Sequence, residues 1–219
     1  MERSFPVKFL ENPIFNGITE EEYRELDALG CTRHALYKRE SAVFRTGDRT
    51  REFGILLSGA LHIENIDLWG NRIILYNISQ GEAFAETYAL SGIPMMVDVT
   101  ASGDSEILFL DLGKMLDEQN SSRPWHTKFP HNLLQLSAAK NIAWFSRMLC
   151  ISSRHIRTRI MTYLSAEAVR SGGREIVIPF NRQQMADYLN VDRSALSREL
   201  GKMQEEGILE FRKNRFRLI

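Results

Sequence analysis

The residues best suited to chemistry lie near the carboxyl end, on one side of a predicted helix. Asp192 is a favourable N-cap residue for that helix. Its apolar spacing turns Leu196, Leu200 and Met203 inward. The residues left outward near its amino end are Arg193, Ser194, Ser197 and Arg198. Because arginine can form two hydrogen bonds with guanine and serine is an adaptable contact, these four are candidate base-reading residues.

A shorter helix is predicted directly before it. Asn181 can cap this helix, whose inner face is Met185, Ala186 and Leu189. Asn190 follows at the turn, where a residue that tolerates a positive φ is favoured. Two helices in this order are typical of a helix-turn-helix, which places its second helix in the major groove of DNA. The alternative is an ordinary helical pair with a solvated basic face.

The last thirteen residues, 207–219, predict two strands joined by a turn at Lys213 and Asn214. A hairpin in this position is the wing of a winged helix-turn-helix. Cationic side chains here and at the start of the first helix can meet DNA phosphates. The candidate phosphate contacts are Arg182, Arg212, Lys213 and Arg215.

The charge balance divides the chain at the same place. The whole chain of 219 residues has 28 basic and 28 acidic residues, a net charge of zero. Residues 151–219 hold 13 basic and 8 acidic residues, a net charge of +5, which leaves −5 for residues 1–150. Neutrality of the total therefore does not exclude a nucleic-acid partner.

The acidic part has regularly spaced glycines between short strand-like runs at 53–57, 61–63, 72–76, 97–100 and 106–110. Turn glycines at such intervals are typical of a β-sandwich, barrel or jelly roll, although chance spacing is the alternative. The glycines are Gly47, Gly59, Gly70, Gly81, Gly92 and Gly103.

A long helix is predicted over 132–150, which contains no Gly or Pro, after a loop marked by Pro124 and Pro130. Its apolar residues fall on several sides, so several sides need cover. We interpret it as a dimerisation helix; an internal core helix is the alternative. Residues spaced alternately four and three positions apart lie along one side of a helix, as in a coiled coil, and we call this row the seam. The seam consists of Leu134, Ala138, Asn141, Phe145 and Met148.

A β-roll, a long helix and a winged helix-turn-helix, in this order, resemble the Crp/Fnr superfamily of bacterial transcription regulators. The resemblance is strongest at 182–189 and 193–198, and extends to 43–48 and 56–63. It implies an α+β fold: a jelly-roll (double-stranded β-helix) sensing domain at 1–127, a dimerisation helix at 128–150 and a DNA-binding domain at 151–219. It further implies a cytoplasmic homodimer on a near-palindromic operator in double-stranded DNA, controlled by a small-molecule effector, with RNA polymerase as a partner if the protein activates transcription.

The sensing domain departs from that family at its ligand site. Cyclic-nucleotide-binding relatives have an Arg and a Ser or Thr that hold the cyclic phosphate, but Met96 and Val97 stand at those positions. A buried phosphate without a cationic partner is strongly disfavoured, so we expect no cyclic AMP binding. An apolar or aromatic effector is expected instead, although plain core packing is the alternative. The candidate pocket residues are Phe84, Glu86, Met95 and Met96.

The identity of a cofactor stays open. Cys31 and Cys150 are two thiols and cannot supply the four ligands of an iron–sulfur cluster. Residues 84–101 are similar to the haem-associated nitric-oxide-responsive branch, and the candidate axial ligands are His34, His62, His126, His131 and His155. No metal-ligand cluster, catalytic constellation or membrane-spanning run is evident, so no enzyme and no membrane partner are expected. The alternative function is a ligand-binding or protein-interaction module with a non-functional helix-turn-helix.

Overall fold

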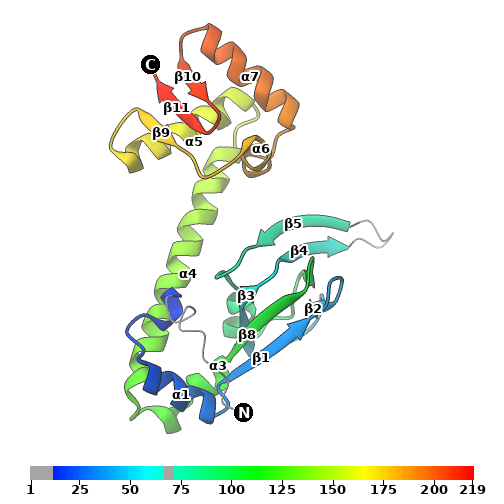
Figure 1. The fold of residues 1–219 in the computed structure, drawn as a ribbon, viewed down its shortest axis with the longest axis vertical. Coiled ribbons are helices and arrows are strands. Elements are labelled where there is room, and N and C mark those ends of the chain that lie inside the picture. Colours follow the sequence, from blue (N-terminus) through cyan, green and yellow to red (C-terminus); the bar gives the residue numbers. More distant parts are fainter. Residues whose placement is uncertain (1–11, 67–71) are drawn as a thin grey trace. The chain divides into compact units, whose positions relative to one another are not determined.

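The computed structural model describes residues 12–66 and 72–219 (Figure 1). Gly70 of the glycine series lies outside these ranges. The chain forms two compact units, one up to Ser137 and one from Ala138 to Ile219. The division falls inside the long helix. Separate functions for 1–127, 128–150 and 151–219 stay a prediction.

The first unit contains two antiparallel four-stranded sheets, which confirms the predicted β-roll. One sheet has the strand order β1-β8-β3-β6 and the other β2-β7-β4-β5. The short β6 and the charged β1 were not predicted, because neither forms an apolar run. The strands are β1 (Thr32–Tyr37), β2 (Ala42–Phe44), β3 (Glu52–Ser58), β4 (Leu61–Ile66), β5 (Arg72–Ile78), β6 (Ala83–Phe84), β7 (Asp98–Ala101) and β8 (Ser105–Asp111).

Strand β8 is buried on both faces and separates two cores. Because side chains alternate along a strand, Ile107 and Phe109 point to one side and Leu108 and Leu110 to the other. The first pair packs between the two sheets with Leu61, in what we call the roll core. The second pair packs under a helical layer, in what we call the cap core. A strand buried on both faces reads as a continuous apolar run, as residues 107–110 do.

The helical layer consists of short elements and the start of a long helix. Thr19 and Glu22 form a capping box at the start of α1. The Glu22 carboxylate also accepts from Lys128 Nζ at 2.6 Å, and Glu25 accepts from Trp125 Nε1 at 2.7 Å. The acidic face of α1 thus holds the long helix in place. The short elements are η2 (Pro13–Phe15), α1 (Glu20–Ala28), α2 (Glu86–Ser91), α3 (Leu112–Met115) and η3 (Glu118–Asn120).

The long helix α4 spans Pro124–Ile151, so the prediction of a loop up to Pro130 is wrong. Pro124 suits the first position of a helix, where no donor is needed. Pro130 lies inside the helix and cannot donate a backbone hydrogen bond, which ordinarily costs about 3 kcal/mol. Trp125 and Phe129, four residues apart, are both fully buried in the cap core. Each aromatic burial contributes about 1.5–3 kcal/mol, so packing outweighs the proline.

The second unit contains the remaining part of α4, three further helices and a three-stranded antiparallel sheet of order β10-β11-β9. It confirms the predicted helix pair and the wing hairpin. The inner residues Met185, Leu189, Leu196, Leu200 and Met203 are all fully buried in one core. Its elements are α5 (Ile156–Ser171), β9 (Glu175–Val177), α6 (Arg182–Leu189), α7 (Arg193–Glu205), β10 (Leu209–Arg212) and β11 (Arg215–Leu218).

Among the described residues, no helix combines the length and the hydropathy required to cross a membrane.

The glycine series provides a test of the roll. Gly59 has φ +92°, and a Cβ there would lie 2.4 Å from the carbonyl oxygen of Asp104. Gly59→Ala should therefore lower the free energy of unfolding by about 2–4 kcal/mol, from backbone strain and a clash with main chain. A Cβ on Gly103 would meet nothing within 4 Å, so Gly103→Ala is the matched control. Urea unfolding of both variants checks this; equal stabilities would contradict it.

Candidate functional site

Local sequence signals fix the geometry of the helix pair α6 and α7. Asn181 and Gln184 exchange side-chain-to-backbone hydrogen bonds at the start of α6. Asn190 ends α6 in the left-handed conformation with φ 52°, as predicted. The Asp192 carboxylate then accepts from the amides of Ser194 and Ala195 and starts α7. The turn between the helices thus combines the left-handed backbone of Asn190 with the Asp192 cap.

The four candidate base-reading residues occupy the first two turns of α7, and all four are exposed. They lie on the side opposite to Leu196 and Leu200, which are fully buried. An exposed amino-terminal face on the second helix is the surface that a helix-turn-helix presents to base edges. The structure thus brings Arg193, Ser194, Ser197 and Arg198 together on one surface.

Ser194 differs from the other three because its hydroxyl is already engaged. Its Oγ donates to Oδ1 of Asp192 at 2.5 Å. This hydrogen bond is the largest cause that lowers the pKa of the Asp192 carboxyl, followed by those from the amides of Ala195 and Ser194. The Ser194 donor is used in capping α7, and only its acceptor capacity remains for a base. Arg193, Ser197 and Arg198 are the freer recognition groups.

The predicted phosphate contacts fall into two kinds. Arg212, Lys213 and Arg215 are exposed on the wing. Arg182 is half-buried instead, and its guanidinium carbon lies 5.0 Å from the centre of the Phe211 ring. Burial lowers the pKa of Arg182. The structure thus uses the Arg182 side chain to hold the wing to α6, which the sequence did not indicate.

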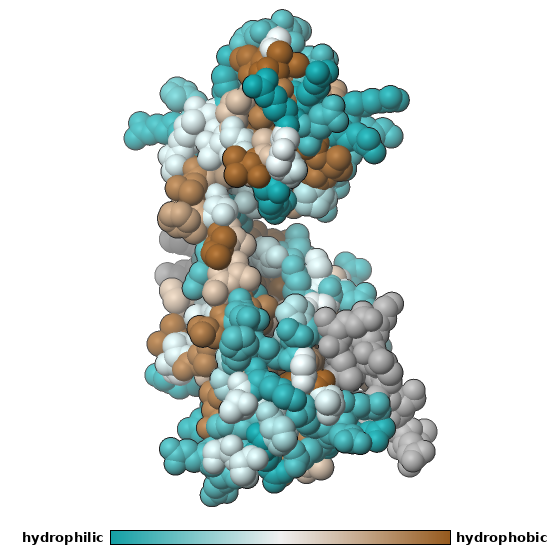
Figure 2. Space-filling model, turned by 90° about the vertical axis from the view of Figure 1, so that its left-hand side faces the viewer, coloured by the Kyte–Doolittle hydropathy of each residue, from teal (hydrophilic) through white to brown (hydrophobic). Residues whose placement is uncertain are grey.

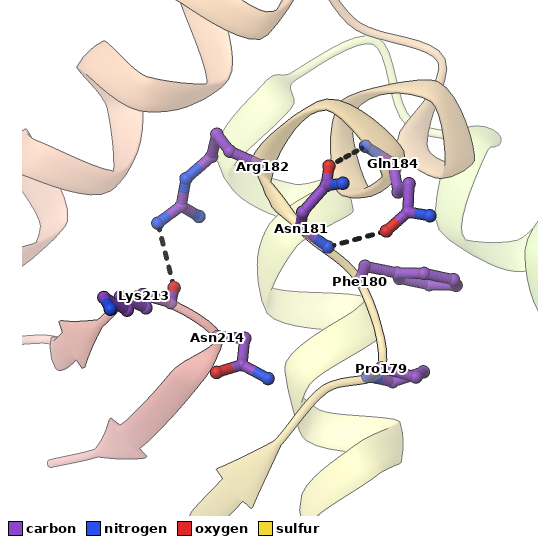
Figure 3. Close-up of a pocket in the computed structure, with 7 residues that line it drawn as sticks. All are labelled: Pro179, Phe180, Asn181, Arg182, Gln184, Lys213 and Asn214. Carbon is purple, nitrogen blue, oxygen red and sulfur yellow. Dashed lines mark hydrogen bonds between the residues drawn. The ribbon is translucent and has the colours of Figure 1, made fainter.

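A shallow cleft lies between the start of α6 and the wing turn. Figure 3 shows Arg182 reaching across it to donate to the Lys213 carbonyl oxygen, at 3.3 Å, with the side chains of Lys213 and Asn214 on the wing side. Lys213 has φ 56°, which turns the hairpin tightly. Asn214 donates to the carbonyl oxygen of Ile178 and ties the turn to the segment after β9. These two hydrogen bonds hold the backbone of the wing turn, which carries the exposed Lys213 side chain.

The four candidate effector-pocket residues do not gather in one place. Phe84 and Met95 are buried in the roll core, and Glu86 is buried at the start of α2. Met96 is 69% exposed and lies outside the roll core, and its role in an effector pocket stays a prediction. Met96 lies in the bend that precedes β7, whereas Met95 is buried directly before that bend. Phe84 also packs directly on Gly54, where an added Cβ would lie 2.3 Å from the Phe84 ring.

The strand-to-helix connection in this region is strained. Ala85 lies between Phe84 and Glu86 with φ 65°. A left-handed backbone is costly for any residue with a Cβ and is ordinarily occupied by glycine. The conformation lets Phe84 stay in the core while α2 begins with a buried Glu86. No signal in the residue type of Ala85 predicted it.

The predicted seam of α4 is exposed along its length. Leu134, Phe145 and Met148 expose 69%, 57% and 54% of their surfaces, and Ala138 and Asn141 are exposed as well. Figure 2 shows apolar side chains gathered along the exposed side of this helix. Ile142 and Trp144 add further exposed apolar surface. Patches of this kind mark interaction sites in proteins that are otherwise well packed.

The candidate axial ligands are dispersed. His34 lies on β1, His62 on β4, His126 and His131 on α4, and His155 just before α5. Among the described residues, no group of three or more His, Cys, Asp or Glu side chains could hold a metal ion.

Sequence reasoning missed three arginines that contact the helix pair, Arg147, Arg157 and Arg159. Each makes long-range hydrogen bonds to backbone or carboxylate groups, and nothing in the local pattern marks such partners. Arg157 donates to Glu206, which directly follows α7, and to Glu199 of α7, at 2.7 and 2.6 Å, and these carboxylates raise its pKa. The side of α7 that faces away from the base-reading groups is thus held by an ion-pair cluster.

Comparison with known proteins gives matches in both units. The family model for the cyclic nucleotide-binding domain matches residues 35–121, and that for the Crp-like helix-turn-helix domain matches residues 158–219. The second of these is the DNA-binding domain of a family of transcription regulators. No curated protein sequence matches the chain.

Solved structures share the fold at low sequence identity. FixK2 from Bradyrhizobium japonicum is 18% identical, with a TM-score of 0.51 over 85% of this chain and 92% of that one. DNR from Pseudomonas aeruginosa is 19% identical, with a TM-score of 0.52 over 100% and 95%. CprK in complex with OCPA is 17% identical, with a TM-score of 0.61 over 89% and 88%. At these identities the likeness concerns the fold.

The strain at Ala85 yields a test of the roll side of the site. Ala85→Gly should raise the free energy of unfolding by about 0.5–1 kcal/mol, because glycine adopts the left-handed conformation without a Cβ penalty. Ala83→Gly, two residues earlier in β6, should lower it, since glycine weakens a strand and removes a buried methyl group. Urea unfolding distinguishes the two. Equal destabilisation by both variants would show that Ala85 does not hold the left-handed conformation.

Proposed function

Because the chain belongs to the Crp/Fnr superfamily of DNA-binding transcription regulators, we propose that it works as a homodimer on a near-palindromic operator in double-stranded DNA. The observation that carries this proposal is the exposed face of Arg193, Ser197 and Arg198 on a helix whose other side is fully buried. One such face per protomer would read one half-site. The cytoplasm is the proposed location, and RNA polymerase is the proposed partner if the protein activates transcription.

The wing supports the proposal by supplying charge without sequence reading. Arg212, Lys213 and Arg215 are exposed on one hairpin. Cations that meet phosphates position a protein on DNA and make its affinity fall with salt. The carboxy-terminal excess of basic residues is thus concentrated next to the recognition helix. We propose that α7 reads bases and that the wing holds the backbone.

Pairing of two α4 helices is the proposed route to the dimer. The exposed seam from Leu134 to Met148 repeats at the interval of a coiled coil. Burying these side chains against a second copy would remove apolar surface from water, and each large side chain is worth about 1.5–3 kcal/mol. The seam thereby accounts for exposed residues that the single chain leaves without cover.

The proposed effector is a small molecule other than cyclic AMP. The first unit has the cyclic nucleotide-binding fold, but Met96 and Val97 supply no cation or hydroxyl where the phosphate would lie. An uncharged, largely apolar or aromatic effector is consistent with the roll core around Phe84 and Met95. CprK, a relative in fold, was solved in complex with OCPA.

Base reading by Arg198 can be tested on an operator selected from random DNA. Arg198→Ala should weaken operator binding by about 1–3 kcal/mol, the scale of a bidentate base contact, and leave binding to random DNA nearly unchanged. Arg212→Ala with Lys213→Ala should weaken both and reduce the salt dependence. Arg170→Ala, which removes an exposed charge from the end of α5, is the control. Equal loss on operator and random DNA for Arg198→Ala would contradict base reading.

Dimerisation through the seam predicts that Phe145→Glu yields monomers, because two carboxylates would face each other in an apolar interface. The control is Ala139→Glu, an exposed position about 120° around the helix from Phe145. Sedimentation equilibrium measures the outcome. A dimer that persists in Phe145→Glu, or that is lost in both variants, would place the interface elsewhere.

A further inference from the structure

The carboxyl end of α6 lies at the turn before the recognition helix and needs external partners. The last carbonyls of any helix lack intrahelical donors and carry a partial negative charge. A basic side chain in the last turn commonly meets this need, but α6 has none. The amides of Asn190 and Val191 bond back to Ala186 and Asp187. The carbonyls of Tyr188, Leu189 and Asn190 are left for other donors.

Arg147, on the penultimate turn of α4, supplies the first of these donors. Its Nε donates to the carbonyl oxygen of Tyr188 and its Nη2 to that of Asp187, both at 3.1 Å. Its guanidinium carbon also lies 5.8 Å from the ring centres of both Trp144 and Tyr188. The group is therefore fixed by two hydrogen bonds and two aromatic rings, and it brings a full positive charge to the end of the helix.

Arg159, on the first turn of α5, supplies the others. Its Nη1 donates to the carbonyl oxygens of Leu189 and Asn190, at 2.9 and 2.7 Å. Its Nε donates to the carbonyl oxygen of Ser153, at 2.7 Å, in the link between α4 and α5. Two arginines from two helices thus contact four consecutive carbonyls, 187 to 190. Both arginines belong to the same compact unit as the helix pair.

The planar guanidinium is what makes this arrangement specific. Arginine offers five donors in a fixed geometry, so one side chain can bond two successive carbonyls in defined directions. Lysine supplies the charge but not the two directions. Hydrogen bonds that involve a charged donor are also the stronger class. A change at this site should therefore alter the angle of α6, and with it the start of α7, as well as the stability of α6.

We infer that Arg147 is a positioning residue for base recognition. It fastens the α6–α7 turn to the same turns of α4 that carry Phe145 and Met148, so the orientation of the recognition helix follows the end of α4. This inference rests on the proposed DNA-binding function and deepens it. Arg147 lies on α4 about 160° around the helix from Phe145, so the seam and the contact to α6 use nearly opposite sides of the helix.

The test uses the full chain with Arg147→Gln and Arg147→Lys, and with Arg154→Gln as a control that removes an exposed arginine close by. Arg147→Gln should leave the dimer intact in sedimentation. It should speed hydrogen exchange of the Asn190 and Val191 amides about tenfold or more and weaken binding to a selected operator by a similar factor, relative to Arg154→Gln. Random DNA should be bound as by the control. Arg147→Lys should fall between.

Two outcomes separate the inference from the function on which it rests. If Arg147→Gln matches Arg154→Gln in both exchange and operator affinity, Arg147 is not a positioning residue and the inference is overturned, whatever the wild-type protein binds. If the wild-type protein shows no preference for any DNA sequence but the exchange of Arg147→Gln is still faster, the proposed function fails while the structural contact stands. Faster exchange with unchanged operator affinity would also overturn the positioning role.

Discussion

Leu134, Phe145 and Met148 on α4 expose more than half of their surface to solvent. Other residues of the same helix are fully buried. The first turns of the helix are fixed in the cap core by Trp125 and Phe129. Asn132 adds a buried polar anchor, because its amide donates to the carbonyl oxygens of Ile14 and Asn16. The exposed stripe is therefore not a sign of a loosely held helix. It is an apolar surface that the helix presents to solvent, and it supports the proposed dimer.

The position of Arg147 explains how α4 can carry the proposed dimer seam and also contact the helix pair α6 and α7. A coiled-coil seam needs one side of α4, which leaves another side free for contact with the helix pair. Arg147 uses that other side, and Arg157 and Arg159 extend the contact through α5 to α7 and to the turn. Each of these bonds ends on a backbone carbonyl or a carboxylate. The cations that hold the helix pair are thus distinct from the exposed cations of α7 and the wing.

The sequence predicted the features that depend on neighbouring residues, such as helix caps. It did not predict the features that depend on contacts with residues far away in the chain. The capping residues Asn181 and Asp192 and the left-handed Asn190 were predictable because each bonds to its own neighbours. Pro130 was misjudged, since burial of Trp125 and Phe129 against residues far away in sequence overrides its helix-breaking tendency. Arg182 was predicted only as a phosphate contact. Its packing against Phe211 and Phe216 depends on the tertiary structure and could not be predicted from the local sequence. Likewise, the burial of Met95 in the roll core and the exposure of Met96 depend on the tertiary structure.

The proposal of an apolar effector in place of a phosphate-bearing one rests on the residues that the roll provides. A ligand can shift a regulator only if it binds two arrangements with different affinity. A phosphate ligand would gain that difference from a cation or a hydroxyl, and Met96 and Val97 provide neither. What the roll provides is an apolar interior with Phe84 packed on Gly54 and held by the strained Ala85. Phe84, Ala85 and Glu86 are consecutive residues, so a proposed apolar ligand that displaces the Phe84 ring would act on the segment that leads directly into α2.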